Sequence, residues 1–558
     1  MSHGRSVFLF FLLLLLFPYT SVADEIPVIV GCEPEEESPY WMMALKASQD
    51  PVYPGIPGGR PFWNKHASRF IYAPAFHFPR LSKAGSYQFT ARVKGDSGRY
   101  VFQTSAPGNA LSPIWAEMEC GSVELVVEAL DSTGALLDTV GRKSFLKSPP
   151  FNGPYNKPSY PYREAGRRSL HALLHQEKIQ YWLEHSDPDP SYPLWVHPTK
   201  IMGAVATGLI HYAHYFPDAS DVRMAEEMAR IAADYLLEMR EPSGSPLEYW
   251  PPTYWNGVPP ENHPVYDYQL MTNYPAEGGM VFLDMYDVTG EKGYYHAAVR
   301  IADTYVHLQD SSGTWPQLYN TRTGEPVTAN LLIPTMVVRF FDRLIQIYEE
   351  EQYRESRDRA FQWCLKNPVV TYNWQGQYED TRPRKPYRNM TREEAAEMSI
   401  LLFQASDEHP GYRDTAEELL RFAEDQFVVW DRRDPVLRTP WFPEGSPFLN
   451  TDPATGSDWF LPAALEQYLF YTPISRSNDT MVEAYRVAHE QTGHEIYRAK
   501  AVSLANTLTR AQAWHGGGEI PTHLRRNLPE KNWINCGVYP ALLLIRSHDW
   551  LTGHEEMN

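Results

Sequence analysis

The spacing of apolar and polar residues changes once along the chain, near residue 150. Before that point, short runs alternate apolar with polar side chains or are rich in β-branched residues, and Gly, Asp, Ser and Pro separate them. The runs cover residues 86–93, 100–103, 123–129 and 136–147. Because such alternation gives a strand one apolar face, residues 24–150 are predicted to form a small antiparallel β-sandwich domain.

After residue 150 the spacing is that of amphipathic helices. Similar segments, each opened by an aromatic or aliphatic residue and followed by a charged face, recur at residues 170–185, 222–235, 294–305, 353–361, 412–422 and 497–506. More uniformly apolar helices are expected between them, beginning near His197, Pro275, Ala329, Thr391, Asp458 and Asn535. Helices that are apolar nearly all round are buried, so outer amphipathic helices alternate with inner ones, about six of each.

This alternation resembles the six-hairpin (α/α) toroid superfamily, which includes unsaturated glucuronyl hydrolases, other glycosidases and several polysaccharide lyases. The resemblance covers about residues 165–550 and includes the loop segments 313–317, 374–380 and 516–521. It implies a mainly α fold, an (α/α)6 toroid catalytic domain over residues 169–558, joined to the β-sandwich by a linker at 151–168. It identifies no individual family. Unequal repeats with long aromatic loops argue against a regular α-solenoid.

Residues 1–23 are predicted to be a cleavable signal peptide. Arg5 supplies a basic start, residues 7–17 are almost purely Leu, Phe and Val, and Ser21-Val22-Ala23 offers small residues for cleavage. The apolar run is about 11 residues long, too short to span a bilayer. We therefore expect a secreted or periplasmic protein, with no membrane span in the mature chain.

The amino-acid composition narrows the classes of molecule that the protein is expected to bind. The net charge of −19, without a basic block, excludes nucleic acid as a main partner, since nucleic-acid affinity comes largely from phosphate neutralisation. The chain has 35 Tyr, 24 Phe and 16 Trp, many in Pro- and Gly-rich loops, where rings suit stacking against a polysaccharide or oligosaccharide. Of the four cysteines, Cys32 and Cys120 share the N-terminal domain, but the sequence alone leaves their pairing open.

No cofactor and no metal site are predicted. The sequence has no P-loop, no GxSxG elbow, no dinucleotide-binding glycine motif and no HExxH. We expect no two histidines at ligand spacing on one helix, while a calcium site of scattered carboxylates stays open. Oligomeric state cannot be predicted from these patterns.

Loops before the inner helices supply the candidate chemistry, and a glycoside hydrolase is the first hypothesis. Hydrolysis needs one carboxyl as proton donor and one carboxylate as base or nucleophile. Glu277, in the first turn of the second inner helix, and Asp458, at the start of the fifth, are the expected pair, with Glu248 and Glu379 as substitutes. The rings expected to stack on sugar are Tyr254, Trp255, Trp374 and Trp459. Helix capping explains Glu277 and Asp458 nearly as well.

A polysaccharide lyase is the alternative hypothesis. β-Elimination at a uronate needs a base, for which His197 and Tyr274 are candidates. It also needs groups that neutralise the carboxylate, and Asn273, Arg384 and Arg388 are expected to do so, since Arg binds carboxylates through two parallel hydrogen bonds. A non-catalytic glycan-binding protein is the third hypothesis, because one fold hosts many functions.

Overall fold

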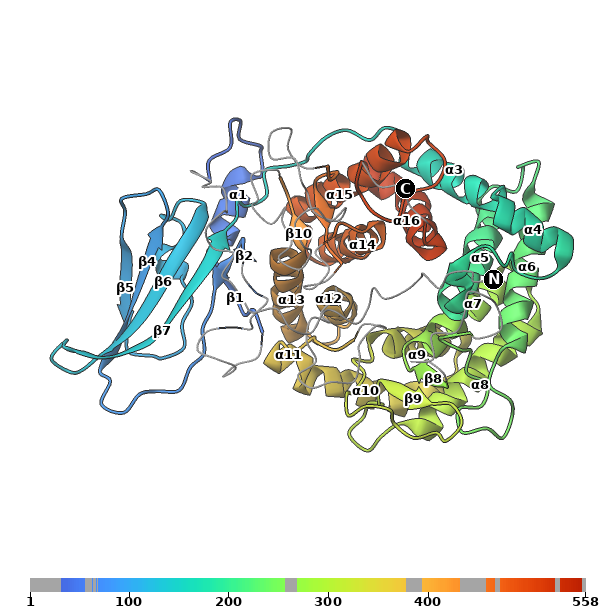
Figure 1. The fold of residues 1–558 in the computed structure, drawn as a ribbon, viewed down its shortest axis with the longest axis horizontal. Coiled ribbons are helices and arrows are strands. Elements are labelled where there is room, and N and C mark those ends of the chain that lie inside the picture. The colour runs from blue at the N-terminus through green and yellow to red at the C-terminus, as the bar shows by residue number, and fades with distance from the viewer. Residues whose placement is uncertain are drawn as a thin grey trace, which may run out of the picture.

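The structure is a computed structural model that describes residues 32–55, 63, 67, 69–255, 268–377, 394–431, 458–466, 472–526 and 532–553. The predicted signal peptide lies outside these ranges. A β-rich N-terminal part stands beside a ring of helices, and the two parts are in contact (Figure 1).

The N-terminal part is built on one five-stranded sheet. Its strand order is β2-β7-β6-β4-β5, with β2 (Arg69–Phe70), β4 (Ser86–Val93), β5 (Tyr100–Thr104), β6 (Gly121–Leu130) and β7 (Leu136–Lys147). The four longer strands coincide with the four predicted runs. The sheet is mixed rather than wholly antiparallel, because β2 pairs with β7 in parallel. In this described part, the short parallel pair β1 (Pro51–Val52) and β3 (Ala73–Pro74) takes the place of a second full sheet.

Two short helices and a disulfide complete this part. Helix α1 spans Trp41–Ala47 and α2 spans Ser112–Trp115. Cys32 and Cys120 form a disulfide beside the buried ring of Trp41, which answers the pairing question that the sequence left open.

Twelve longer helices form hairpins, each with an outer and an inner member. The outer helices are α3 (Tyr162–Leu174), α6 (Val222–Glu238), α8 (Lys292–Leu308), α10 (Arg354–Lys366), α13 (Gly411–Phe427) and α15 (Glu495–Trp514). The inner helices are α5 (Pro198–Tyr215), α7 (Tyr274–Thr289), α9 (Thr335–Tyr348), α12 (Glu394–Gln404), α14 (Ser475–Thr492) and α16 (Ile534–Arg546). Shorter helices lie between or after them: α4 (Glu177–His185), α11 (Pro368–Thr371), α17 (His548–Thr552) and the 3-10 helices Pro193–Val196 and Glu351–Tyr353. Two short strand pairs also occur: β8 (Gln269–Met271) pairs with β9 (Leu318–Asn320), and β10 (Val428–Val429) pairs with β11 (Ala463–Ala464).

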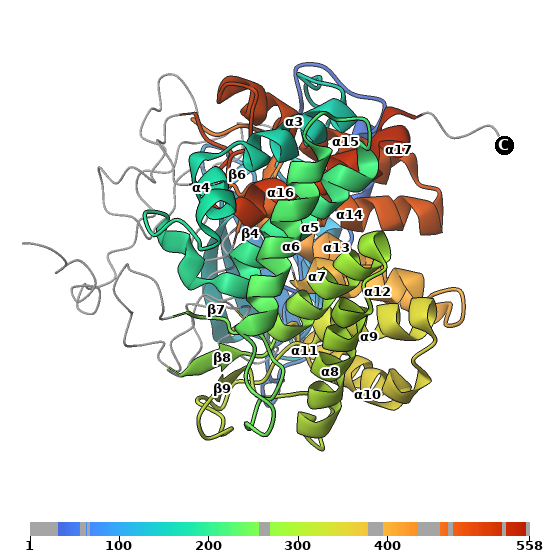
Figure 2. The same ribbon diagram turned by 90° about the vertical axis from the view of Figure 1, so that its right-hand side faces the viewer.

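The inner helices close into a ring. Each contacts the next in the order α5, α7, α9, α12, α14, α16, and α16 returns to α5 (Figures 1 and 2). Each inner helix also packs on an outer one, and α16 packs on α3, so the last inner helix is covered by the first outer helix. The predicted mainly α fold, an (α/α)6 toroid after a β-rich domain, is confirmed.

Three of the predicted starts of inner helices agree with the structure, and two do not. Helices α5, α7 and α16 begin within a residue of the positions expected near His197, Pro275 and Asn535. The expectations at Ala329 and Asp458 are wrong, because α9 begins at Thr335 and α14 at Ser475. The residues before them are extended and bridge to other segments: Leu331 pairs with Pro316, and Trp459 pairs with Arg525. Helix α3 begins at Tyr162, inside the predicted linker.

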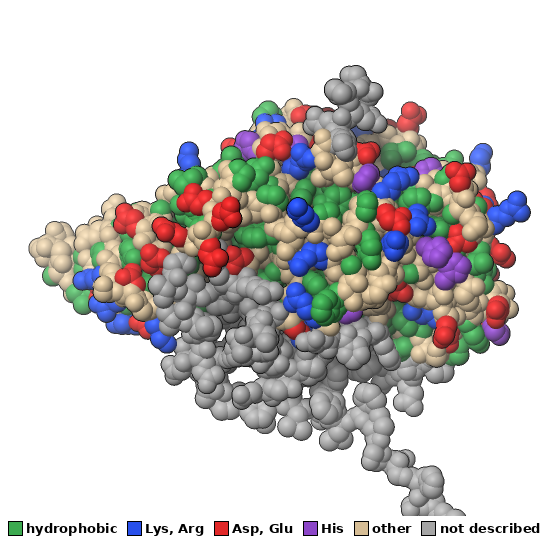
Figure 3. Space-filling model, turned by 90° about the horizontal axis from the view of Figure 1, so that it is seen from above, with side chains coloured by type: hydrophobic (Ala, Val, Ile, Leu, Met, Phe, Trp, Pro, Cys, Tyr) green, Lys and Arg blue, Asp and Glu red, His purple; other side chains and the backbone are tan. Residues whose placement is uncertain are grey.

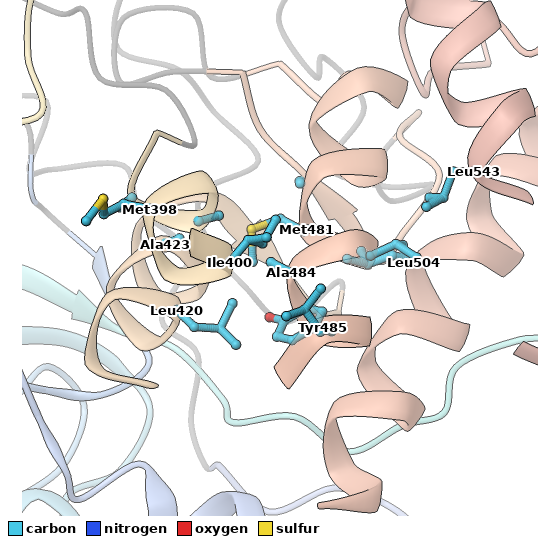
Figure 4. Packing of buried hydrophobic residues seen from close by; sticks show 14 of the residues in the cluster. Met398, Ile400, Leu420, Ala423, Met481, Ala484, Tyr485, Leu504 and Leu543 are labelled. Atoms are coloured by element: carbon cyan, nitrogen blue, oxygen red, sulfur yellow. The ribbon is translucent and has the colours of Figure 1, made fainter. Parts of the chain in front are cut away.

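Buried apolar side chains between hairpins hold the ring together. Figure 4 shows Ile400 of α12 and Leu420 of α13 beside Met481 and Tyr485 of α14, and all four are at most 4 % exposed. Burial of such side chains is the main favourable contribution to folding.

Glycine lets two inner helices approach closely. A Cβ atom built on Gly279 of α7 would lie 2.4 Å from the ring of Phe340 on α9, which is fully buried. No side chain fits in that space without moving the ring.

Polar contacts bind the sheet to the ring. Asp425 of α13 accepts hydrogen bonds from the backbone N–H groups of Ile71 and Tyr72 at 2.7 and 2.8 Å. Arg69 donates to the backbone carbonyls of Asp425 and Val428. Because these groups are buried, the sheet is attached in one defined orientation. In the described part of the chain, none of the helices has the length and hydropathy of a transmembrane segment.

Candidate functional site

Charged and phenolic side chains from four inner helices meet at the centre of the ring. We call Glu277 of α7, Glu397 of α12, Arg476 and Asp479 of α14, and Tyr539 of α16 the axial cluster. Arg476 forms an ion pair with Asp479, and its guanidinium lies 4.6 Å from the centre of the Tyr539 ring. Glu277 and Glu397 both act electrostatically on Arg476. Since α7 and α14 lie on opposite sides of the ring, the interaction of Glu277 with Arg476 crosses its axis.

Helical spacing explains why these side chains converge. On α14, Arg476, Asp479 and Glu483 follow one another at three- and four-residue intervals and therefore share one face. The same spacing relates Glu277 to Asp284 two turns further along α7. Each axial residue lies in the first two turns of its helix, so the cluster sits toward the N-terminal ends of the inner helices.

Burial sets the charge states in the cluster. The pKa of Tyr539 is raised by burial and further by Glu277, so its phenol stays protonated at neutral pH. Burial also raises the pKa of Asp479, and Arg476 opposes this rise without cancelling it. Burial disfavours the charge on Arg476, but Asp479, Tyr539 and Glu277 outweigh it and raise its pKa. Arg476 is therefore a fixed positive charge among carboxyls.

A second polar group lies deeper in the ring, on α5, α7, α9 and α16. Arg343 of α9 pairs with Asp284 of α7 at 2.8 Å, and Arg546 of α16 donates to His211 of α5 at 2.8 Å. Burial would raise the pKa of Asp284, yet His211, Arg343 and Arg546 hold it well below its usual range. These contacts link four inner helices, which makes this group a structural support beneath the axial cluster.

Aromatic rings surround the start of α5, an inner helix that packs against α7 and α16 of the axial cluster. The ring of His197 lies 5.6 Å from that of Tyr254 and 5.4 Å from that of Trp533. The ammonium group of Lys200 lies 4.5 Å from the centre of the Trp533 ring. All four side chains are partly exposed. Of the predicted residues, His197 and Tyr254 thus lie together, while Trp533 and Lys200 complete the group.

The other predicted residues near α7 lie in positions less suited to contact with a substrate. Tyr274 is 3 % exposed and packs with Met271 and Leu318, so it is a poor candidate for a base that must reach substrate. Asn273 precedes α7, and its buried Oδ1 atom has no hydrogen-bond partner among the described residues. Trp255 is partly exposed and packs against Tyr235 of outer helix α6.

Three residues that were predicted to act on or bind a sugar, Glu248, Trp374 and Trp459, are buried or hydrogen-bonded elsewhere in the protein. The Glu248 carboxylate accepts a hydrogen bond from the N–H of Gly244 within a tight turn, and its backbone carbonyl accepts one from Thr304 of outer helix α8. Trp374 is fully buried and Trp459 is 1 % exposed, so neither ring offers a face to a sugar. Their loops look exposed by composition, but they fold back onto the protein.

Asp458 does not begin a helix as predicted. It forms an ion pair with the buried Arg525 at 2.7 Å, next to the bridge between Trp459 and Arg525. Glu379, Arg384 and Arg388 lie outside the described residues.

The expectation of no paired histidines on one helix is wrong. His171 of α3 and His175, which caps the C-terminal end of that helix, are one turn apart, and their rings lie 4.5 Å apart. Asp221, which precedes α6, completes a group able to hold a metal ion. The four-residue spacing was present in the sequence and was overlooked, whereas Asp221 lies far along the chain. The axial residues Glu397, Arg476, Asp479 and Tyr539 were also missed, because attention went to loops rather than to charges inside apolar helices.

Solved structures with a similar fold share little sequence identity with this chain. No family model matches the chain, and no curated protein does. Similar solved structures include a family 76 glycoside hydrolase from a bovine Bacteroides thetaiotaomicron strain, with 11 % identity, 88 % of this chain and 99 % of that chain covered, and a TM-score of 0.45. They include the cellobiose 2-epimerase of Spirochaeta thermophila DSM 6192, with 13 % identity, 70 % and 98 % covered, and a TM-score of 0.47.

An unsaturated glucuronyl hydrolase specific for heparin is also similar, with 10 % identity, 70 % and 98 % covered, and a TM-score of 0.45. At these values the likeness assigns neither an activity nor a role to any residue. The six-hairpin architecture stands on the helix contacts described above.

Proposed function

We propose that this protein is a carbohydrate-active enzyme that hydrolyses a glycosidic bond at the axial cluster. The observation that carries the proposal is the pair of carboxyls, Glu277 and Glu397, which come from different inner helices and both act on the charge of Arg476. Partly exposed rings of Tyr254 and Trp533 lie at the start of the neighbouring helix α5 and of α16, where a sugar could stack.

Each residue of the cluster has a role in this proposal. Glu277, with one carboxylate oxygen shielded from solvent in the first turn of α7, is assigned as the proton donor to the leaving oxygen. Glu397 accepts a hydrogen bond from the hydroxyl of Thr335 at 2.8 Å, which orients it as base or nucleophile. Arg476 and Tyr539 would donate hydrogen bonds to sugar hydroxyls. Asp458 leaves the predicted pair because its partner is Arg525.

Hydrolysis is favoured over β-elimination by the state of the tyrosines. Tyr274 is buried, and the raised pKa of Tyr539 makes its phenolate scarce at neutral pH. A lyase would then depend on His197 as its base, among the rings of Tyr254 and Trp533.

A substrate screen tests the class of reaction. Neutral and uronate-containing plant and algal polysaccharides are incubated with the protein, and new reducing ends are measured together with ultraviolet absorbance. Hydrolysis yields reducing ends alone, whereas β-elimination also yields a C4–C5 double bond that absorbs. Absorbing products would replace the hydrolase by the lyase, and binding without turnover would leave a glycan-binding protein.

Variants test the site on whichever substrate is cleaved. Glu277→Gln and Glu397→Gln keep the shape of each side chain and should each reduce kcat at least about 100-fold, the usual contribution of a positioned acid or base. Glu226→Gln, on the exposed face of outer helix α6, is the matched control and should leave kcat unchanged. Wild-type turnover in both axial variants would refute the assignment.

We further propose that the chain is exported. The pattern of residues 1–23 supports this, and so does the Cys32–Cys120 disulfide, since such bonds persist mainly in oxidising compartments. N-terminal sequencing of protein recovered after expression with residues 1–23 should give a chain that starts at Asp24. An uncleaved N-terminus would contradict the proposal.

A further inference from the structure

Two histidines and an aspartate meet on the outside of the ring, far along the chain from the axial cluster. His171 and His175 lie on the last turn and at the end of α3, and Asp221 lies directly before α6. The Nε2 atom of His175 is 2.9 Å from Oδ2 of Asp221, and that of His171 is 3.5 Å from the same oxygen. The histidine side chains are 47 % and 42 % exposed, so an ion from solvent can reach them. Figure 3 shows one face of the molecule on which histidine side chains lie exposed among interspersed acidic and basic groups.

The spacing of these three atoms suits a tetrahedral ion. Zinc binds histidine nitrogen and carboxylate oxygen at about 2.0–2.1 Å, which places two ligands of a tetrahedron about 3.3 Å apart. The observed 2.9 and 3.5 Å separations lie on either side of that value, and all three ligand atoms lie within 4.8 Å of one another. Both histidine nitrogens therefore already lie near ligand spacing from the Asp221 oxygen, and rotation of the histidine side chains would set their spacing from each other.

Neighbouring groups already orient the aspartate. The hydroxyl of Tyr212 on α5 donates to Oδ1 of Asp221 at 3.0 Å, which leaves Oδ2 directed toward the histidines. Metal-binding carboxylates are commonly held by such an outer hydrogen bond. The C-terminal end of α3, where both histidines lie, carries the negative end of the helix dipole and favours a cation.

We propose that His171, His175 and Asp221 bind a divalent first-row transition-metal ion such as Zn²⁺, with a water molecule as the fourth ligand. Both histidines would bind through Nε2 as neutral imidazoles, so a proton on either Nε2 atom moves to Nδ1 or is released when the ion binds. Two neutral nitrogens, one carboxylate and one water form the kind of ligand set that zinc accepts.

The bound ion would stabilise the place where the first and last hairpins of the helical ring meet. Helix α3 packs on α16, the last inner helix, while Asp221 belongs to the hairpin of α5 and α6. A bound ion would thus link α3, which covers α16, to the hairpin formed by α5 and α6. This role is independent of the proposed hydrolase activity.

Metal titration of the full chain, produced without a polyhistidine tag and treated with EDTA, tests the proposal. ZnCl2 is added in a calorimeter and in a thermal-unfolding assay. We expect one ion per chain and, at about a hundredfold excess over Kd, a rise in Tm of about 2–3 °C for a protein of this size. EDTA should reverse the rise. A wild-type protein without a stoichiometric response would overturn the proposal and leave only a histidine–aspartate hydrogen bond.

Three variants separate loss of a ligand from loss of structure. His171→Gln retains the His175–Asp221 contact, so its metal-free Tm should equal that of wild type while zinc affinity falls at least about tenfold, the lower end expected when a metal site is impaired. His175→Gln should lose the response altogether. His185→Gln, on exposed α4 and stacked on Tyr181, is the control and should titrate like wild type. Unchanged zinc binding in both His171→Gln and His175→Gln would place the ion elsewhere and overturn the assignment.

Discussion

The carboxyl group of Asp425 is one of the buried polar contacts that attach the sheet to the ring, and replacing Asp425 with alanine tests its contribution. Oδ1 of Asp425 accepts hydrogen bonds from the backbone N–H groups of Ile71 and Tyr72, and all three residues are at most 6 % exposed. In Asp425→Ala both donors lose their acceptor, and water has little access to replace it.

The magnitude follows from those two donors. Each buried polar group left without a partner costs about 1–3 kcal/mol, so Asp425→Ala should lower the free energy of unfolding by about 2–6 kcal/mol. The entropy of unfolding for a chain of this size is about 1 kcal/mol per kelvin, so Tm should fall by about 2–6 °C. A transition of the sheet at lower temperature than the ring would be the extreme form of the same effect.

Asp425→Asn separates hydrogen bonding from charge. Its amide oxygen can still accept from both N–H groups, so its loss should be smaller than that of alanine. Burial raises the pKa of Asp425 to about 7, against the opposing effects of the Tyr72 N–H and Arg69. The folded state thus holds the proton more tightly than the unfolded state, whose pKa is near 3.8, and this group's contribution to wild-type stability falls as pH rises from about 4 to about 7.

Chemical denaturation of the three proteins at pH 5 and pH 8 measures both effects. Asp425→Asn cannot titrate, so it should gain on wild type as pH rises, by at most about 1.4 kcal/mol per pH unit. An alanine variant within about 0.5 kcal/mol of wild type, the usual range for a surface substitution, would refute the reasoning. So would an asparagine variant as unstable as the alanine one.

Two further predictions concern the interior of the ring. Gly279→Ala places a methyl group 2.4 Å from the Phe340 ring and should lower stability by about 1–3 kcal/mol in thermal or urea unfolding. Gly293→Ala on α8, where a Cβ meets nothing within 4 Å, should be neutral or stabilising, and equal losses in both would contradict the packing argument. Asp284→Asn should cost about 1–3 kcal/mol at pH 7, because Arg343 then keeps only its ion pair with the more exposed Asp287, and the charge that interacts with Arg546 is lost. Because the folded pKa of Asp284 is depressed, that difference should shrink as pH falls below about 4, and a difference that stays constant down to pH 3 would show that its charge contributes little.

Local patterns were enough for the elements but not for their long-range partners. Strand β4 matches the predicted range because alternation along 86–93 is a property of those residues alone, and β7 matches the range expected for a further hairpin strand. The start of α14 was misplaced because residues before it are held extended by bridges such as Ile474 with His523, which no local pattern reveals. Trp374 was expected in a sugar site from its loop composition, yet it is fully buried.

The candidate site shows the same limit. Glu277 was found from its place in the first turn of an apolar helix. Glu397 has the same signal, a charge in the first turn of an apolar inner helix, whereas Arg476 lies in the polar first turn of α14, and the interaction of both with one another depends on the closure of the whole ring. His171 and His175 could have been paired from sequence, and Asp221 could not, since it joins them only when α6 packs beside α3.

The contact of α16 with α3 and α5 has a consequence for synthesis of the chain. Until residues Ile534–Arg546 have left the ribosome, the hairpins can form only an open crescent, with apolar faces of α3, α5 and α14 exposed to water. Contacts between such distant parts of a chain form late, and exposed apolar surface favours aggregation in the meantime. The toroid therefore closes only after α16 has been made, and a truncation that removes Ile534–Arg546 should leave an aggregation-prone protein rather than a slightly smaller ring.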